Sequence, residues 1–110
     1  RRYSDIIEIA KDQIRKTYMS DEISLNTIAA EVGMSPSYFS SIFSKEMGKT
    51  FVEYLTEIRM DRAKELLMCS STKTSEIGYE VGYKDPHYFS YIFKKTQNCT
   101  PKEFRARGKE

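Results

Sequence analysis

The sequence predicts an all-α protein of about seven helices, in which one helical unit occurs twice. Apolar residues recur at helical spacing, no segment alternates polar with apolar side chains, and all three prolines stand where a helix would begin. The string EVGMSPSYFSSIF, residues 31–43, returns as EVGYKDPHYFSYIF, residues 80–93, with one extra residue. We place the extra residue in a turn, because one residue inserted into a helix would rotate its outer face by about 100°.

Two helices are predicted before the turn of the first copy. Residues 4–18 carry apolar side chains at i, i+3 and i+4, which is the spacing of an amphipathic helix. A short helix over residues 25–32 begins at Ser24, whose hydroxyl can cap the first free amides. It ends at Gly33, because the left-handed conformation that follows many helices is least costly for glycine.

A third helix and a longer connecting helix follow. Serine before proline, at Ser35 and Pro36, indicates a helix start, and Gly48 indicates the end of that helix. The T-x-x-E pattern of residues 50–53 is a capping box, so it predicts the start of a long helix over residues 51–69. The predicted apolar stripe of the connecting helix is Phe51, Leu55, Ile58, the stem of Arg62, and Leu66.

The second copy repeats these signals. Residues 77–81 sit in a short helix that is again followed by glycine, and Asp85 with Pro86 restarts the chain. Asn98 stands where the first copy has glycine, and asparagine also tolerates the left-handed conformation. The T-x-x-E pattern returns at residues 100–103 and predicts a last helix. We therefore divide the chain into residues 1–50 (N-terminal helix and first subdomain), 51–69 (connecting helix) and 70–110 (second subdomain and C-terminal helix).

A short helix, a turn with glycine and a capped second helix form the helix-turn-helix arrangement. The second helix of such a unit projects from the surface and fits the major groove of DNA. Two copies with matched caps therefore indicate sequence-specific binding of double-stranded DNA. The connecting helix would be about 28 Å long at 1.5 Å per residue, and major grooves recur about every 34 Å on one DNA face. We expect a monomer to contact two successive grooves of an asymmetric, bipartite site.

Composition bounds the other possibilities. The 110 residues fit one or two small domains. The net charge is only +2, but six of the eight charged side chains from Lys94 onward are basic. No apolar run is long enough to span a membrane and no signal peptide is visible. The chain does not begin with Met, so we expect a piece of a longer, cytoplasmic protein.

The sequence argues against two other classes of function, a protein-binding module and an enzyme. A helical module that binds protein would need an exposed apolar groove, whereas the predicted outer faces carry Ser, Lys and His. An enzyme is excluded, because no nucleophile lies beside a base and no phosphate loop is present. Cys69 and Cys99 stand 30 positions apart beside a single histidine, which is not a zinc spacing. We therefore expect free thiols, no metal and no cofactor.

Two long strings resemble the DNA-binding domain of the AraC/XylS family of bacterial transcription regulators. They are IAAEVGMSPSYFSSIFSKEMGKTFVEYLTEIRMDRAKELL and IGYEVGYKDPHYFSYIFKKTQNCTPKEFR, and the resemblance covers about residues 6–105. The most specific part is G-Y-x-D-x-x-Y-F-S-x-x-F-K-K followed by T-P-x-x-F-R. The resemblance implies two helix-turn-helix subdomains, transcription activation, contact with RNA polymerase, and a sensing domain upstream. The tyrosine-rich second copy is most similar to members fused to a response-regulator receiver domain.

Three positions depart from the family pattern. Family members usually have alanine at Gly78, an aliphatic residue at Thr74 and glycine at Asn98. Because glycine inside a helix costs about 1 kcal/mol, the first two departures predict a slightly looser second subdomain.

The resemblance assigns base reading to the outer face of each second helix. The residues so assigned are Pro36, Ser37, Ser40 and Ser41 in the first copy, and Pro86, His87, Ser90 and Tyr91 in the second. Serine hydroxyls discriminate bases weakly, whereas His87 can donate to a guanine acceptor and Tyr91 can pack on a thymine methyl. The alternative is simple solvent exposure. The first copy offers no Arg, Asn or Gln, so we expect it to depend more on bridging water and DNA shape.

Phosphate contacts are expected around these faces. The assigned residues are Ser35, Tyr38, Lys45, Arg59, Tyr88, Lys94 and Lys95. For Arg59 and Arg62 the alternative is an ion pair with Glu65 or Asp61. Tyr38 and Tyr88 can equally be packing residues, and Asp85 would be only a cap because phosphate repels it. Backbone amides near Leu25 and Ser75 are further candidates.

Overall fold

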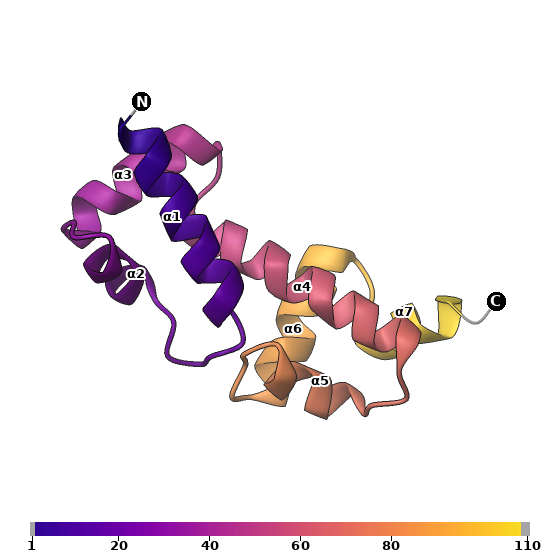
Figure 1. Ribbon diagram of the computed structural model, residues 1–110. Helices are drawn as coiled ribbons and strands as arrows, with labels where there is room; N and C mark the ends of the chain where they lie inside the picture. Colours follow the sequence, from indigo (N-terminus) through magenta and orange to yellow (C-terminus); the bar gives the residue numbers. More distant parts are fainter. Residues whose placement is uncertain (1, 109–110) are drawn as a thin grey trace. The chain divides into compact units, whose positions relative to one another are not determined.

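The computed structural model describes residues 2–108, which contain seven α-helices and no strand (Figure 1). The helices are α1 (Arg2–Thr17), α2 (Leu25–Glu31), α3 (Pro36–Met47), α4 (Phe51–Cys69), α5 (Thr74–Glu80), α6 (Pro86–Gln97) and α7 (Pro101–Gly108). The all-α prediction and its order of elements are confirmed. Of the residues assigned to the two subdomains, Arg1, Lys109 and Glu110 lie outside the described part of the chain.

The helix ends follow the local signals in the sequence. The Ser24 side chain accepts a hydrogen bond from the Thr27 amide, and Ser35 accepts one from the Tyr38 amide. Both T-x-x-E boxes close in the same way: the threonine amide donates to the glutamate at 2.8 Å, and the glutamate amide donates back at 3.1 Å. These short-range bonds supply partners for amides that a helix cannot pair internally, which fixes where α4 and α7 begin.

Both second helices end in the left-handed conformation. Gly48 follows α3 with φ 73° and Asn98 follows α6 with φ 66°. Asn98 is the one residue other than glycine with a positive φ among the described residues. The prediction that asparagine replaces glycine in the same conformation is therefore confirmed.

Contacts divide the described chain into two compact units, each with its own core. Unit 1 comprises residues 2–18 and 22–58, and unit 2 comprises residues 19–21 and 59–108. Phe39 and Phe43 are fully buried in the core of unit 1, and Phe89 and Phe93 are fully buried in the core of unit 2. Equivalent positions of the two copies thus serve equivalent roles in two separate cores.

The connecting helix α4 contributes to both cores, which corrects its predicted apolar stripe. Phe51 and Leu55 are buried in unit 1 as expected, but Met60 is also buried, in unit 2. Leu66 is half-buried, and Arg62 is exposed. Because different residues of α4 pack into two cores, no single stripe runs the length of the helix.

Gly78 corrects the expectation of a looser second subdomain. It is buried in α5, and a Cβ atom added there would lie 2.9 Å from Cγ and 3.0 Å from Cβ of Phe89 in α6. Atoms at the base of a buried ring cannot move aside easily. The glycine therefore lets α6 approach α5 closely, and its cost in helix propensity is offset by packing.

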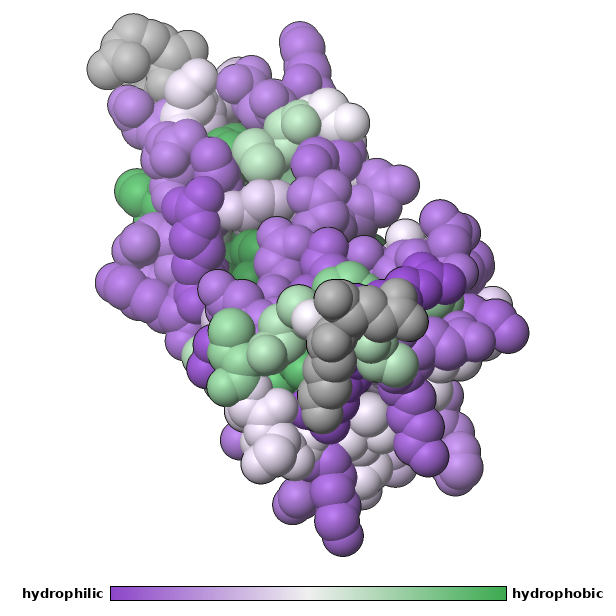
Figure 2. Space-filling model, turned by 90° about the vertical axis from the view of Figure 1, so that its right-hand side faces the viewer, coloured by the Kyte–Doolittle hydropathy of each residue, from purple (hydrophilic) through white to green (hydrophobic). Residues whose placement is uncertain are grey.

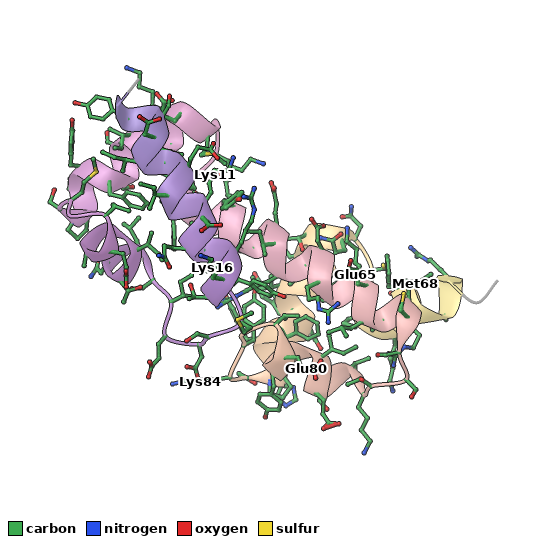
Figure 3. The ribbon with its side chains drawn as sticks, viewed as in Figure 1. Lys11, Lys16, Glu65, Met68, Glu80 and Lys84 are labelled. Atoms are coloured by element: carbon green, nitrogen blue, oxygen red, sulfur yellow. The ribbon has the colours of Figure 1, made fainter. Side chains whose placement is uncertain are left out.

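The segment of residues 19–21 between α1 and α2 belongs to unit 2. The guanidinium of Arg59 donates to the Ser20 carbonyl at 2.9 Å and lies 4.8 Å from the ring centre of Tyr83. Lys84, labelled in Figure 3, reaches the Asp21 carboxylate at 3.8 Å. The segment is therefore held to unit 2 by a buried arginine and an exposed ion pair.

The face of the protein in Figure 2 is largely hydrophilic, with small apolar areas between polar side chains. None of the helices in residues 2–108 combines the length and apolarity needed to cross a bilayer.

Candidate nucleic-acid interface

The outer face of α3 is short and polar. Pro36, Ser37 and Ser41 are exposed, and Ser40 is half-buried. Positions 37, 40, 41 and 44 share one helix face, because i, i+3, i+4 and i+7 superimpose on an α-helix. The predicted residues of the first copy therefore lie together on one surface of unit 1, where their hydroxyls can donate to or accept from base edges.

The outer face of α6 is aromatic as well as polar. His87, Ser90 and Tyr91 are exposed, with Tyr91 at 57%, and Pro86 is half-buried. The Tyr91 ring lies 6.2 Å from the Tyr88 ring, centre to centre. Neighbouring rings restrict the orientation of Tyr91, so this face presents a positioned apolar surface beside the imidazole of His87.

The Tyr88 ring connects this face to the interior of unit 2. It lies 5.8 Å from the Tyr83 ring, which in turn lies 5.9 Å from Phe89 in the core. Tyr88 is nevertheless 50% exposed. It is both a packing residue and an accessible hydroxyl, so the two predicted roles do not exclude each other.

Tyr38 has a partner that the sequence did not indicate. Its hydroxyl donates to the Tyr3 hydroxyl of α1, and the two rings meet edge to face at 6.0 Å. This hydrogen bond is the main cause that raises the pKa of Tyr38 above its ordinary value. Tyr38 remains 45% exposed, so α1 positions it at the surface of unit 1.

Exposed lysines follow the two outer faces. Lys45 in the last turn of α3 and Lys94 and Lys95 in the last turn of α6 are exposed. The Lys95 ammonium lies 5.8 Å from the centre of the Tyr91 ring. The helix dipole stabilises cations at these carboxyl-terminal ends, and the exposed ammonium groups are accessible to an anion.

The caps of the two helices use their side chains differently. Ser35 accepts from the Tyr38 amide and keeps its own hydroxyl proton for another acceptor. Asp85 accepts from the His87 amide at 2.9 Å and has no proton to offer. Asp85 therefore caps α6, and its lack of a phosphate contact stays a prediction.

The predicted phosphate contact of Arg59 is wrong. The sequence placed it among the phosphate contacts, but it is 8% exposed and donates to the Ser20 carbonyl inside unit 2. For Arg62, the expected alternative is confirmed: it pairs with Glu65 at 3.1 Å. The buried position removes Arg59 from the residues that can reach a DNA phosphate.

Residues 2–108 contain no cluster of three or more His, Cys, Asp or Glu side chains that could hold a metal. Cys69 is exposed and Cys99 buried, and both are free thiols, as predicted. Sequence reasoning missed a pocket lined by Lys73, Lys102 and Arg105 beside α5. Lys73 precedes Lys102 and Arg105 by about 30 positions, so only the fold could bring it to them.

Two outer helix faces on capped helix-turn-helix units define this chain as a DNA-binding domain of a transcription regulator. The helix-turn-helix domain family matches residues 28–107. The chain belongs to the AraC-type branch of this family, and its relatives are bacterial transcription regulators.

Three similar proteins illustrate the relationship. An HTH-type transcriptional regulator in the cgkA 5′ region of Pseudoalteromonas carrageenovora is 36% identical over 100 residues, which cover 91% of this chain and 58% of that protein. The lactose operon transcription activator of Staphylococcus xylosus is 38% identical over 90% of this chain and 35% of its own length. The C-terminal domain of AraT, a response regulator from Geobacillus stearothermophilus, superimposes with a TM-score of 0.93 at 36% identity, over 97% of this chain and 88% of that one.

The chain thus spans 58% or less of the length of these two curated relatives.

Proposed function

We propose that this chain reads an asymmetric, bipartite site on double-stranded DNA, with α3 and α6 in successive major grooves. The observation that carries the proposal is the duplication. Helices α3 and α6 each have 12 residues, a side-chain cap, proline at the first turn and a left-handed end. One chain therefore offers two matched reading helices, so two half-sites do not require a symmetric dimer.

The second copy supplies most of the direct discrimination between bases. His87 donates to the N7 or O6 acceptor of guanine, and Tyr91 packs on the methyl group of thymine. Ser90 and Pro86 complete this face. The support is exposure and spacing: His87, Ser90 and Tyr91 are exposed one helical turn apart on α6.

The first copy contributes weaker discrimination. Ser37, Ser40 and Ser41 offer hydroxyls that suit several base edges, with Pro36 at the edge of the groove. In the absence of longer polar side chains, water bridges and DNA deformability supply part of the specificity at this half-site.

Backbone phosphates are bound by the side chains around both faces. The proposed contacts are Ser35, Tyr38 and Lys45 in unit 1, and Tyr88, Lys94 and Lys95 in unit 2. All six are exposed. Such contacts fix the register of a protein on DNA but carry no sequence information.

The whole protein is proposed to be a cytoplasmic activator. In that setting the domain contacts RNA polymerase, and a sensing or receiver domain lies upstream. The support is the similarity to a lactose operon activator and to the C-terminal domain of a response regulator.

The proposal is tested by selecting binders from random duplexes of about 30 base pairs, which span two grooves about 10 base pairs apart. We expect one asymmetric site with two information-rich blocks. His87→Ala with Tyr91→Ala should erase one block and leave the other. Ser37→Ala with Ser41→Ala should weaken the opposite block.

Other outcomes redirect the proposal. A single block that survives every change in α3 would limit base reading to α6. No enrichment, with binding that does not weaken as salt rises, would refute DNA reading and favour a module that binds protein.

A further inference from the structure

Unit 2 contains a basic pocket that none of the side chains assigned to DNA contacts lines, although it includes Ser75, whose backbone region is a phosphate candidate. The pocket has a volume of about 470 Å³ and is lined by Ser71, Lys73, Thr74, Ser75, Lys102 and Arg105. We call it the α5–α7 pocket. The described lining comprises three cations, three hydroxyls and no carboxylate.

Arg105 gives the pocket a fixed cation. Its Nε donates to the Leu67 carbonyl at 3.0 Å and its Nη2 donates to the Ser70 carbonyl at 3.0 Å, so the guanidinium is anchored to the end of α4. Among the described residues, Nη1 takes no part in a hydrogen bond. A guanidinium held in this way loses little further freedom when it binds an anion.

The other donors of the pocket are also uncommitted. Lys73 and Lys102 are exposed and form no ion pair within residues 2–108. The hydroxyls of Ser71 and Ser75 likewise have no partner in that part of the chain. Glu103, the carboxylate next to Lys102, accepts from the Thr100 amide at 2.8 Å. Ammonium, guanidinium and hydroxyl donors in one pocket match the oxygens of a phosphate.

The pocket lies at the start of the helix-turn-helix of unit 2, between α5 and α7. Lys73 directly precedes α5, and Lys102 lies in the first turn of α7. Helix α7 packs on α6 through Phe104, whose ring lies 5.7 Å from that of Phe93. A helix in a major groove has phosphates of both strands beside it, so cations just before and just after the helix pair are the next to reach the backbone.

We propose that the α5–α7 pocket seats a phosphate of the DNA backbone, held by Lys73, Lys102 and the anchored guanidinium of Arg105. The inference rests on the proposed function and adds to it a contact that fixes the second half-site in register. It assigns Lys73 and Lys102 a role that is independent of base sequence.

The test compares the double variant Lys73→Gln/Lys102→Gln with the unchanged chain. Loss of this one phosphate contact should reduce the salt slope by about 0.9, so the ratio of affinities at 50 and 200 mM salt should fall about 3.5-fold. The loss should be the same on the selected site and on an unrelated duplex. Both lysines are exposed, so circular dichroism and thermal unfolding should not change. Arg105 is left intact because it caps α4.

The matched control is Lys16→Gln/Lys64→Gln, which removes the same net charge. Lys16, labelled in Figure 3, pairs with Asp12 on α1, and Lys64 pairs with Asp61 on α4. The control should keep the salt slope of the unchanged chain. A parallel titration with inorganic phosphate, followed by NMR, should shift the amides of residues 71–75 in the unchanged chain but not in the Lys73/Lys102 variant.

The outcomes separate the inference from the proposed function. If the unchanged chain binds DNA and the Lys73/Lys102 variant keeps its slope, the pocket assignment is wrong and the proposed function stands. Phosphate-induced shifts with an unchanged slope would assign the pocket to a free anion and overturn the DNA contact. If the Lys73/Lys102 variant loses sequence preference instead of general affinity, the assignment of the pocket to a backbone phosphate is also contradicted. Absence of DNA binding by the unchanged chain would refute the proposed function itself.

Discussion

At the scale of single residues, Gly78 and Arg59 show how burial changes the meaning of a side chain. From the sequence, Gly78 predicted a less stable helix and Arg59 predicted a phosphate contact. In the structure Gly78 lies against Phe89, and Arg59 is bonded to Ser20. Neither partner could be inferred locally, because Arg59 and Ser20 are 39 positions apart. Sequence patterns predict contacts within one helix, whereas these two contacts depend on which helices and loops pack together.

Gly78→Ala should destabilise unit 2 although alanine is the better helix former. The added methyl would lie within 3.0 Å of the base of the Phe89 ring, and overpacking of this kind costs about 1–3 kcal/mol. Urea denaturation measures the loss. In a Phe89→Ala background, which removes Cγ and the ring, the same substitution should cost less, and a double-mutant cycle reports this as coupling. Additive effects, or a more stable Gly78→Ala variant, would contradict the close approach.

Arg59→Met should lower the free energy of unfolding by about 1.5–3 kcal/mol, because the Ser20 carbonyl loses a charged donor. Arg62→Met is the control. Arg62 is exposed in an i,i+3 pair with Glu65, so its replacement should change stability by less than about 0.5 kcal/mol. Equal effects in chemical denaturation would show that Arg59 is not a structural residue.

At the scale of elements, the sequence predicted helix starts better than helix faces. Ser24, Ser35, Thr50 and Thr100 all cap as expected, because a cap involves residues within one turn. The interior of α4 was predicted less well. It packs into two cores, and a single amphipathic period cannot describe a helix with two sets of neighbours. The outer faces of α3 and α6 could be predicted because polar residues recur at helical spacing.

The capping box of α7 should depend on pH. The hydrogen bond from the Thr100 amide lowers the pKa of Glu103 below its ordinary 4.5. A lowered pKa in the folded state means that the contribution to stability is full above the unfolded value and is lost as pH falls through the folded value. NMR titration of the Glu103 carboxyl should give a midpoint below 4.5.

Hydrogen exchange at the amides of Thr100 and Glu103 provides the second readout. Protection should decrease as pH falls through the Glu103 midpoint, after correction for intrinsic exchange rates. Glu103→Gln keeps an acceptor that does not titrate, so its protection should not change over this range. A midpoint at or above 4.5 would show that the box does not hold the carboxylate.

At the scale of the whole molecule, the protein is two cores joined by one uninterrupted helix. Phe43 and Phe93 occupy equivalent places in the two copies, and both are fully buried. Each core has its own aromatic cluster, so local stability can be set separately in each unit.

Phe93→Leu should therefore lower hydrogen-exchange protection mainly in residues 59–108, because the lost packing belongs to unit 2. Phe43→Leu is the matched counterpart, and it should affect residues 2–18 and 22–58. Native-state exchange followed by mass spectrometry resolves the two regions. A uniform loss over the whole chain in both variants would show instead that the two cores unfold as one cooperative unit.

Because α3 and α6 have the same length and the same kinds of start and end, side chains can be exchanged between their outer faces. On the two outer faces, Ser37 and Ser41 correspond to His87 and Tyr91, whereas positions 40 and 90 are both serine. Ser37→His with Ser41→Tyr would give α3 the side chains that α6 already carries, on a helix of the same length with the same kind of start and end. Such a chain would carry the same side chains on both outer faces, so under the proposed base reading its selected operator should contain the same block of bases twice.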